Sequence, residues 1–310
     1  MTQRFIVLCG GVGGSRLAEG LAQHLPPEAL TIVVNTGDDF DHLGLRICPD
    51  IDTVLYMLAG CVSRERGWGR DDESWVAHQT LATLGGPAWF QLGDRDIGLH
   101  LARNALLSEG RGLAETVRRL ASALGVSYAP VPVTEIPAPT IVRTVEGDLA
   151  FQDYFVRRRA DVSVLGLRYG ATPATPLSEE VETAFADPHL AGIIIAPSNP
   201  FLSIAPMLAT GDLRQKLAGR TVPVLAVSPY IDGQAVKGPV ARLQADLGLP
   251  AGDAGLLACY AGLVDILFTS GSDCHAADHI SIEDGDTFMP DAQGRGRVAR
   301  RVLERLGWRG

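Results

Sequence analysis

The chain has 310 residues, of which 46% are hydrophobic and 20% charged, and its 27 basic and 36 acidic residues give a formal net charge of −9. This composition excludes a disordered, collagen-like or coiled-coil protein, and the acidic balance argues against attraction to nucleic acid or to anionic lipid. Five scattered cysteines without a CxxC pair, and the lack of a leader-like start or a long apolar run, predict a cytoplasmic protein with no membrane anchor.

Short apolar runs, each followed by a polar turn and an amphipathic helix, recur along the chain. This alternation is typical of parallel strands joined by crossover helices. The expected strands are residues 5–9, 30–34, 162–167, 192–196, 222–227 and 265–268. We therefore predict an α/β fold with a Rossmann-like, mostly parallel sheet and helices on both faces, in a single domain spanning residues 1–310.

Residues 60–160 are less regular. They contain three tryptophans, helices expected near residues 72–84 and 94–124, and a proline-rich passage at residues 130–139. We interpret this stretch as a largely helical insertion that covers the substrate. The tail from Arg295 has apolar residues at helical spacing among arginines, which predicts a closing helix with a solvated basic face.

A glycine-rich segment, GGVGGSR at residues 10–16, follows the first expected strand and opens a helix. Bare backbone N–H groups and the helix dipole at such a turn face an anion, so we interpret the segment as a phosphate loop. It is neither a Walker A motif, which needs a lysine before Ser or Thr, nor a GxGxxG motif. A tight strand-to-helix turn without a ligand is the alternative.

Five aspartates gather after the second strand and at the start of the next helix. They are Asp38, Asp39, Asp41, Asp50 and Asp52. Their mutual repulsion needs a compensating charge, and Mg²⁺ commonly takes one or two carboxylates plus substrate phosphates. Turn formation and helix capping account for some of the five, so we predict a metal role for only one or two.

The segment at residues 92–100 alternates charges at an expected helix start. His100 and Arg103 would lie one or two turns along that helix. A solvated ion-pair face and a ligand-binding face fit this pattern equally well.

Polar side chains also follow two later strands. Ser198 and Asn199 lie in a turn stiffened by two prolines, where they would donate to phosphate oxygens or a base edge, or cap a helix. Ser228 follows the strand at residues 222–227, and Lys237 would supply a point charge for phosphate.

Taken in order, these motifs resemble the 2-phospho-L-lactate transferase family of coenzyme F420 biosynthesis. The segments that carry the resemblance are GGVGG at 10–14, NTGDD at 35–39, CPDIDTVLY at 48–56, LGDRD at 92–96, APSNP at 196–200 and VSP at 227–229. Beyond residue 245 the resemblance is thinner, because residues 269–271 are Thr-Ser-Gly where many members have an acidic residue.

The resemblance implies an Mg²⁺-using enzyme, commonly a homodimer, with two substrates. The donor is a guanosine-diphosphate-linked three-carbon acid carrying a phospholactyl, phosphoenolpyruvyl or phosphoglyceryl group. The acceptor is the deazaflavin Fo. The terminal hydroxyl of the ribityl chain of Fo attacks the phosphorus that bears the acid, GMP leaves, and the phosphodiester F420-0 or its dehydro analogue forms.

On this basis we assign Asp38 and Asp50 to Mg²⁺, and Asp52 to the hydroxyl of Fo as ligand or base. Asp50 and Asp52 are the predicted catalytic residues. Gln91 stands where some relatives have Lys, and Arg95 or Lys237 would balance the negative charge. The predicted substrate-binding residues are Gly11, Val12, Gly13, Gly14, Ser15, Asn35, Thr36, Asp39, Asp52, Gln91, Asp94, Arg95, Ser198, Asn199, Pro200, Ser228 and Lys237.

Two other functions share parts of this pattern. A non-catalytic, nucleotide-sugar-binding regulatory protein of the same superfamily would have the glycine loop and the Ser-Asn-Pro turn, but it has no need of clustered acids. A dinucleotide-dependent oxidoreductase is suggested only by the strand, glycine loop and helix, and the departure from GxGxxG argues against it.

Overall fold

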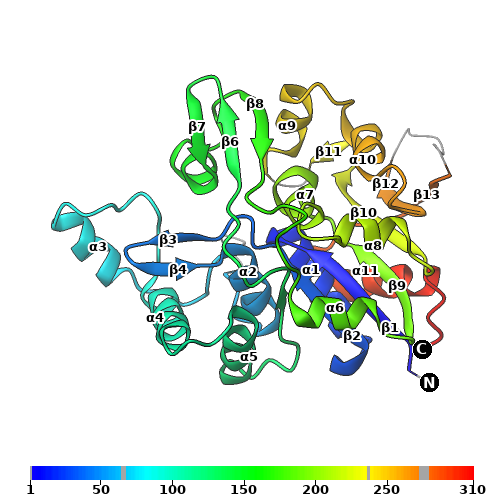
Figure 1. The fold of residues 1–310 in the computed structure, drawn as a ribbon, viewed down its shortest axis with the longest axis horizontal. Helices are drawn as coiled ribbons and strands as arrows, with labels where there is room; N and C mark the ends of the chain where they lie inside the picture. The colour runs from blue at the N-terminus through cyan, green and yellow to red at the C-terminus, as the bar shows by residue number, and fades with distance from the viewer. Residues whose placement is uncertain (1, 64–67, 236–237, 272–278) are drawn as a thin grey trace.

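A mostly parallel sheet forms the centre of the computed structural model, which describes residues 2–63, 68–235, 238–271 and 279–310 (Figure 1). In these residues the sheet has eight strands, ordered β5, β2, β1, β9, β10, β12 and β13, with β11 paired to β10. Its strands are β1 (Arg4–Cys9), β2 (Leu30–Val34), β5 (Val131–Pro132), β9 (Leu190–Ile195), β10 (Val224–Ile231), β11 (Gln234–Ala235), β12 (Ile266–Ser270) and β13 (Ser281–Asp284). This is the Rossmann order, in which the direction of progress reverses next to β1, and it confirms the predicted fold class.

Strand β1 is apolar on both faces because helices cover both sides of the sheet. Ile6 and Val7 point to opposite faces, yet the exposed fraction of each is 1% or less. β1 pairs in parallel with β2, where Val7 lies opposite Ile32, and with β9, where Val7 lies opposite Ile194. The carboxyl ends of these strands therefore meet at one edge of the sheet.

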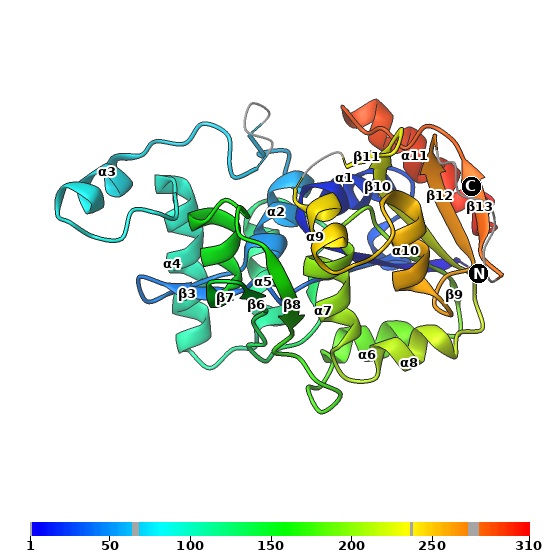
Figure 2. The same cartoon turned by 90° about the horizontal axis from the view of Figure 1, so that it is seen from above.

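The helices form two layers. Helices α1, α2, α5 and α11 share a buried apolar cluster on one face of the sheet, and helices α6 to α10 share another on the opposite face. Figure 2 shows α11 and α8 on opposite sides of the strands. The helices are α1 (Gly11–Ala22), α2 (Pro49–Leu58), α3 (Val76–Thr83), α4 (Asp94–Ser108), α5 (Leu113–Ala123), α6 (Glu179–Phe185), α7 (Ala205–Leu208), α8 (Leu213–Ala218), α9 (Val240–Asp246), α10 (Gly252–Tyr260) and α11 (Ala292–Arg305). Among the described residues, none of these helices has the length and apolarity needed to cross a bilayer.

The closing helix predicted in the tail is α11. Asp291 caps its N-terminus by accepting a hydrogen bond of 2.8 Å from the Gly294 amide. The helix packs tightly on α1, since a Cβ added to Gly20 would lie 2.3 Å from the carbonyl oxygen of Arg295. The side chain of Arg295 pairs with Glu19 of α1, whereas other arginines of the helix face solvent.

One predicted strand of the central sheet belongs elsewhere. The run at residues 162–167 forms β8 (Val164–Arg168), which pairs antiparallel with β6 (Ile141–Thr144) in a small separate sheet that also holds β7 (Gly147–Ala150). Val164 is buried but Leu165 is 64% exposed, so only one face of this sheet is covered. An apolar run of this length does not reveal whether both of its faces will be buried.

The stretch at residues 60–160 departs from the prediction in two further ways. It contributes β5, an edge strand of the central sheet, as well as helices. The helical region expected at residues 94–124 divides into α4 and α5 at a turn in which Gly110 has a φ of 82°. Helix α3 lies at the end of the molecule farthest from the two termini (Figure 1) and has no buried residue.

Candidate active site

The glycine loop meets the loop after β9 at the point where the strand order reverses. The Gly10 amide donates to Ser198 Oγ at 3.0 Å, and Ser198 Oγ donates to the Gly10 carbonyl at 2.8 Å. A Cβ on Gly13 would lie 2.2 Å from the carbonyl oxygen of Pro197, so only glycine permits this approach. The Ser198 hydroxyl, predicted to donate to phosphate, here holds the two loops together.

Asp50 lies in the first turn of α2 and faces the glycine loop. Its Oδ1 accepts a hydrogen bond of 2.6 Å from the Gly11 amide, and its Oδ2 accepts one of 3.0 Å from Asn35 Nδ2. The same Asn35 amide group lies 3.4 Å from Asp38 Oδ1. Asn35, at the end of β2, therefore links Asp38 and Asp50, the two carboxylates that we expected from the sequence to bind Mg²⁺.

The two carboxylates are buried and repel each other. Burial raises the pKa of Asp38 well above its usual range, and the charges of Asp50 and Asp39 raise it further. Burial also raises the pKa of Asp50 to about 6, although its hydrogen bonds from Asn35 and Gly11 act in the opposite direction. A cation placed between Asp38 and Asp50 would relieve this repulsion.

These residues fit Mg²⁺ only if other ligands complete its coordination. Among the described residues, no group of three or more His, Cys, Asp or Glu side chains is arranged to hold a metal ion. Two carboxylates are nevertheless a common protein contribution to an Mg²⁺ site, because water and substrate phosphates supply the remaining oxygens. The donor set therefore suits a metal that arrives with a phosphorylated substrate.

Asp52 lies one half-turn further along α2 and is bound by a buried arginine. Both terminal nitrogens of Arg103 contact the two carboxylate oxygens of Asp52, with Nη1 3.1 Å from Oδ2. Arg103 is fully buried, and it also donates to the Arg46 carbonyl at 3.2 Å. A bidentate pair of this kind fixes the orientation of the carboxylate.

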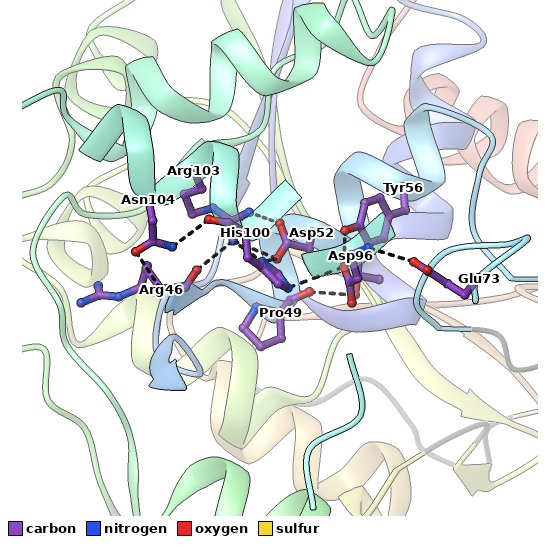
Figure 3. Close-up of polar contacts among 10 residues, drawn as sticks. Arg46, Pro49, Asp52, Tyr56, Glu73, Asp96, His100, Arg103 and Asn104 are labelled. Carbon is purple, nitrogen blue, oxygen red and sulfur yellow. Dashed lines mark hydrogen bonds and ion pairs between the residues drawn. The ribbon is translucent and has the colours of Figure 1, made fainter. Parts of the chain in front are cut away.

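His100 and Asp96 extend this network along α4 (Figure 3). His100 Nδ1 lies 3.1 Å from Arg103 Nη1, and Tyr56 donates its hydroxyl proton to Asp96 Oδ1. Burial and the charge of Asp52 raise the pKa of Asp96 to about 7, and burial lowers the pKa of His100 to about 4. His100 and Arg103 thus belong to a buried network, whereas Arg95 of the same segment is exposed.

One pocket of about 710 Å³ is lined by Asp38, Asp50, Asp52, Asp96 and His100. The glycine loop and Ser198 stand at one part of its wall, and aromatic side chains form another. Trp89 and Phe90 pack edge-on against each other with ring centroids 5.6 Å apart, and Phe151 stacks on Phe155 at 5.6 Å. Flat aromatic walls suit a planar ring system, and the sequence did not single out these four residues.

The structure brings most of the predicted site residues together, but not all of them. The predicted residues that line the pocket are Gly11, Val12, Gly13, Asp38, Asp50, Asp52, Gln91, Ser198, Asn199 and Ser228. Those that do not line it are Gly14, Ser15, Asn35, Thr36, Asp39, Asp94, Arg95 and Pro200. Lys237 lies outside the described residues.

Some of the predicted residues that do not line the pocket contact residues that do. Ser15 Oγ donates to the Val12 carbonyl at 3.0 Å within the first turn of α1. Asn35 contacts Asp38 and Asp50, as described above.

Ser228 does line the pocket, but its hydroxyl donates to the buried Asp253 at 2.5 Å. Its proton is therefore committed to Asp253.

Asp94 and Arg95 do not line the pocket, and the Asp94 carboxylate contacts another helix. Its carboxylate accepts hydrogen bonds from the Val76 and Ala77 amides at 3.1 and 3.0 Å, and so caps α3. Glu73, in return, accepts from the amides of Arg95 and Asp96 at the start of α4. The first residue of α4 thus caps α3, and Glu73, which precedes α3, caps α4, a relationship that local sequence does not reveal.

Arg103, His100, Asp96 and Tyr56 are the site residues that sequence reasoning missed or left undecided. The available signal was their spacing, since Asp96, His100 and Arg103 recur at i, i+4 and i+7 on one helix face. That spacing predicts a shared face but not its burial.

Fold and pocket together define an α/β protein with a pocket where the order of a Rossmann-like sheet reverses. Residues 5–302 match the model of the family described as 2-phospho-L-lactate transferase CofD, and the chain belongs to that family. It is accordingly a transferase of coenzyme F420 biosynthesis, as its motifs predicted.

Curated relatives match almost end to end. The 2-phospho-L-lactate transferase of Methanospirillum hungatei is 35% identical over 96% of this chain and 99% of the relative. The phosphoenolpyruvate transferase of Streptomyces griseus is 34% identical over 97% and 98% of the two chains. A solved structure of a UPF0052 family member from Bacillus halodurans shares the fold, with a TM-score of 0.64 at 15% identity, covering 98% of this chain and 99% of the other.

Proposed function

We propose that this chain transfers a phosphorylated three-carbon acid from a guanosine-diphosphate-linked donor to the terminal ribityl hydroxyl of the deazaflavin Fo. The hydroxyl oxygen forms a bond to the phosphorus that bears the acid, and the bond from that phosphorus to the oxygen of GMP breaks. GMP leaves, and a phosphodiester remains on Fo. The relatives named for transfer of phospholactate and of phosphoenolpyruvate leave phospholactyl, phosphoenolpyruvyl and phosphoglyceryl donors as candidates.

The diphosphate of the donor would lie against the glycine loop. The amides at the N-terminus of α1 and the positive end of its dipole favour an anion there. Gly11, Val12 and Gly13 all line the pocket and lack bulky polar side chains, so phosphate oxygens can approach the backbone closely. Asn199, on the facing loop, also lines the pocket.

Asp38 and Asp50 would hold Mg²⁺. When bound, the ion would neutralise negative charge on the diphosphate and on the departing GMP. Asn35 keeps the two carboxylates oriented in its absence, by donating to Asp50 at 3.0 Å. The support for this assignment is the burial and mutual repulsion of the two carboxylates at the wall of the pocket.

Fo would lie with its planar ring system against the aromatic wall. Residues 60–160 contribute Trp89, Phe90, Phe151 and Phe155 to that wall, in keeping with an insertion that covers the acceptor. Asp52 lines the pocket close to Asp50 in sequence, and we assign it to accept the proton of the attacking hydroxyl. Arg103 positions the Asp52 carboxylate for this role.

The observation that carries the proposal is that one pocket joins three features. A glycine loop, a pair of buried carboxylates and an aromatic wall lie on its surface, matching a diphosphate, a metal and a planar acceptor. Phosphoryl transfer depends mainly on positioning and charge neutralisation, so this combination is what the chemistry requires.

Incubation of the purified protein with Mg²⁺, Fo and each of three donors tests the proposal. The donors are the guanosine-diphosphate-linked forms of phospholactate, phosphoenolpyruvate and phosphoglycerate, and mass spectrometry follows the products. We expect one phosphodiester of Fo and an equimolar amount of GMP with at least one donor. No GMP and no phosphodiester with any of the three would refute the assignment.

We also propose that the protein acts as a homodimer, on the strength of the family resemblance. Sedimentation equilibrium on the purified protein would give twice the chain mass of 32.9 kDa. A species of single-chain mass at micromolar concentration would contradict this.

A further inference from the structure

His100 is a neutral, fully enclosed imidazole whose two ring nitrogens have different surroundings. The exposed fraction of the residue is 1%, and its ring lies between Arg103 and Asp96 (Figure 3). Nδ1 lies 3.1 Å from Nη1 of Arg103, and 3.8 Å from Oδ2 of Asp52. Because a guanidinium nitrogen can only donate, Nδ1 must be the acceptor in this contact.

That contact fixes the tautomer of the ring. An imidazole that accepts at Nδ1 carries its proton on Nε2, provided that it is neutral. Burial, which lowers the pKa of His100 to about 4, keeps it neutral at physiological pH. The fixed charge of Arg103 therefore makes Nε2 an obligatory donor.

Among the residues that the structure describes, this donor has no hydrogen-bond partner. Nε2 is buried and unsatisfied, and the nearest carboxylate oxygen, Oδ1 of Asp96, lies 3.6 Å away, beyond hydrogen-bond distance. Oδ1 accepts the proton of the Tyr56 hydroxyl and, as a carboxylate oxygen, has room for one further donor. A buried donor without a partner is costly in a folded protein unless something else occupies the position.

Both His100 and Asp96 line the pocket, so the missing partner can come from a ligand. A donor and a carboxylate acceptor 3.6 Å apart suit one atom that both accepts and donates a hydrogen bond. An alcohol hydroxyl has this property, whereas an ionised phosphate or carboxylate has no proton to donate to Asp96. His100 and Asp96 belong to α4, whereas the glycine loop opens α1, and we assign their position to the acceptor substrate.

We propose that His100 Nε2 and the Asp96 carboxylate bind one hydroxyl group of the polyol chain of the acceptor substrate. Nε2 donates to the hydroxyl oxygen, and the hydroxyl donates to Asp96. This inference rests on the proposed function, since it places a hydroxylated deazaflavin in the pocket. It makes His100 a specificity residue that distinguishes a polyol side chain from an unsubstituted alkyl chain.

Two substitutions of His100 test the roles of its two ring nitrogens separately. His100→Asn keeps an acceptor near the Nδ1 position for Arg103 but lacks a donor at the Nε2 position. His100→Gln places an amide near the Nε2 position and is the matched control. Binding is measured through the fluorescence of Fo, and in parallel with a deazaflavin that carries a plain alkyl chain instead of the ribityl chain.

We expect His100→Asn to bind Fo about five- to ten-fold more weakly than the wild type, and the alkyl analogue equally well. His100→Gln should stay within about two-fold of the wild type for both compounds. Unchanged binding of Fo by His100→Asn would overturn the inference, and so would an equal loss for Fo and the analogue, since that pattern indicates only structural damage.

A second measurement needs no variant. In wild-type protein labelled with ¹⁵N-histidine, the Nε2–H resonance of His100 should shift when Fo is added and stay in place with the alkyl analogue. An unmoved resonance under saturating Fo would overturn the inference while leaving the proposed function intact. A wild type that binds neither compound and releases no GMP would refute the proposed function itself.

Discussion

Arg103 and Asp52 form a salt bridge that is closed to solvent on the arginine side, where the exposed fraction of the side chain is 0%. Both terminal guanidinium nitrogens contact the carboxylate, and Arg103 also donates to the Arg46 carbonyl, which anchors the hairpin of β3 (Phe40–His42) and β4 (Leu45–Ile47). The pair thus joins α2, which carries the acids of the site, to α4, which carries His100 and Asp96.

Arg103→Met should destabilise the protein strongly, because it leaves a buried carboxylate without its partner. We expect a loss of about 3–5 kcal/mol in the free energy of unfolding, measured by urea denaturation. The control is Asp41→Asn, which removes the ion pair between Asp41 and Arg46. The Asp41 side chain is 66% exposed, so this substitution should cost less than about 1 kcal/mol. Similar losses for the two variants would contradict the role given to Arg103.

Asp38→Asn and Asp50→Asn should each lower turnover by a factor of order 10² or more and raise the Mg²⁺ concentration needed for half-maximal rate. Both substitutions remove a charge that we assign to metal binding while keeping the size of the side chain. Steady-state assays of GMP release across a range of Mg²⁺ concentrations would measure both effects. Asp41→Asn again serves as the control and should behave as the wild type; near-normal rates in both site variants would place the metal elsewhere.

The raised pKa of Asp96 makes stability depend on pH in a direction that can be checked. Its pKa rises from the ordinary 3.8 to about 7 in the folded protein, so the folded state holds the proton after the unfolded state has lost it. The wild type should therefore lose stability relative to Asp96→Asn as the pH rises from about 4 to about 7, by at most about 1.4 kcal/mol per pH unit. Urea denaturation of both proteins at several pH values measures this difference, which should level off above pH 7. A constant difference, or one of opposite sign, would show that Asp96 is not perturbed in this way.

Gly13→Ala tests the close approach of the glycine loop to the loop after β9. The added Cβ would lie 2.2 Å from the Pro197 carbonyl oxygen, so we expect a loss of about 1–3 kcal/mol in stability and weaker donor binding. Gly98→Ala is the matched control, because Gly98 lies within α4 with nothing within 4 Å of an added Cβ, and alanine should stabilise the helix by up to about 1 kcal/mol. If both substitutions had the same effect on stability, the contact with Pro197 would not matter.

The central sheet was predictable because its strands are buried on both faces. Residues 5–9 and 30–34 read as unbroken apolar runs, and β1 and β2 occupy those positions. The short strands β5 and β13 escaped prediction because Pro132 and the exposed Ser281 and Asp284 interrupt that signal. The run that became β8 carried a similar signal, but it was placed in the wrong sheet.

The candidate site likewise has residues that local sequence could place and residues that it could not. Sequence could place the glycine loop and Asp50 at one candidate pocket because their chemistry is local: an amide-rich turn and an acid at a helix start. The surroundings of Asp94 and His100 could not be predicted, because they depend on partners far along the chain, such as the Val76 amide and Asp52. Sequence spacing places a side chain on a helix face, but the packing of other elements decides what that face contacts.

We propose that the terminal hydroxyl of Fo attacks the phosphorus bearing the acid. Fo labelled with ¹⁸O in that hydroxyl, incubated with Mg²⁺ and the donor that supports turnover, tests this claim most directly by mass spectrometry of both products. The account predicts that the phosphodiester retains the label and that GMP carries none. An unlabelled phosphodiester, or label in GMP, would contradict it.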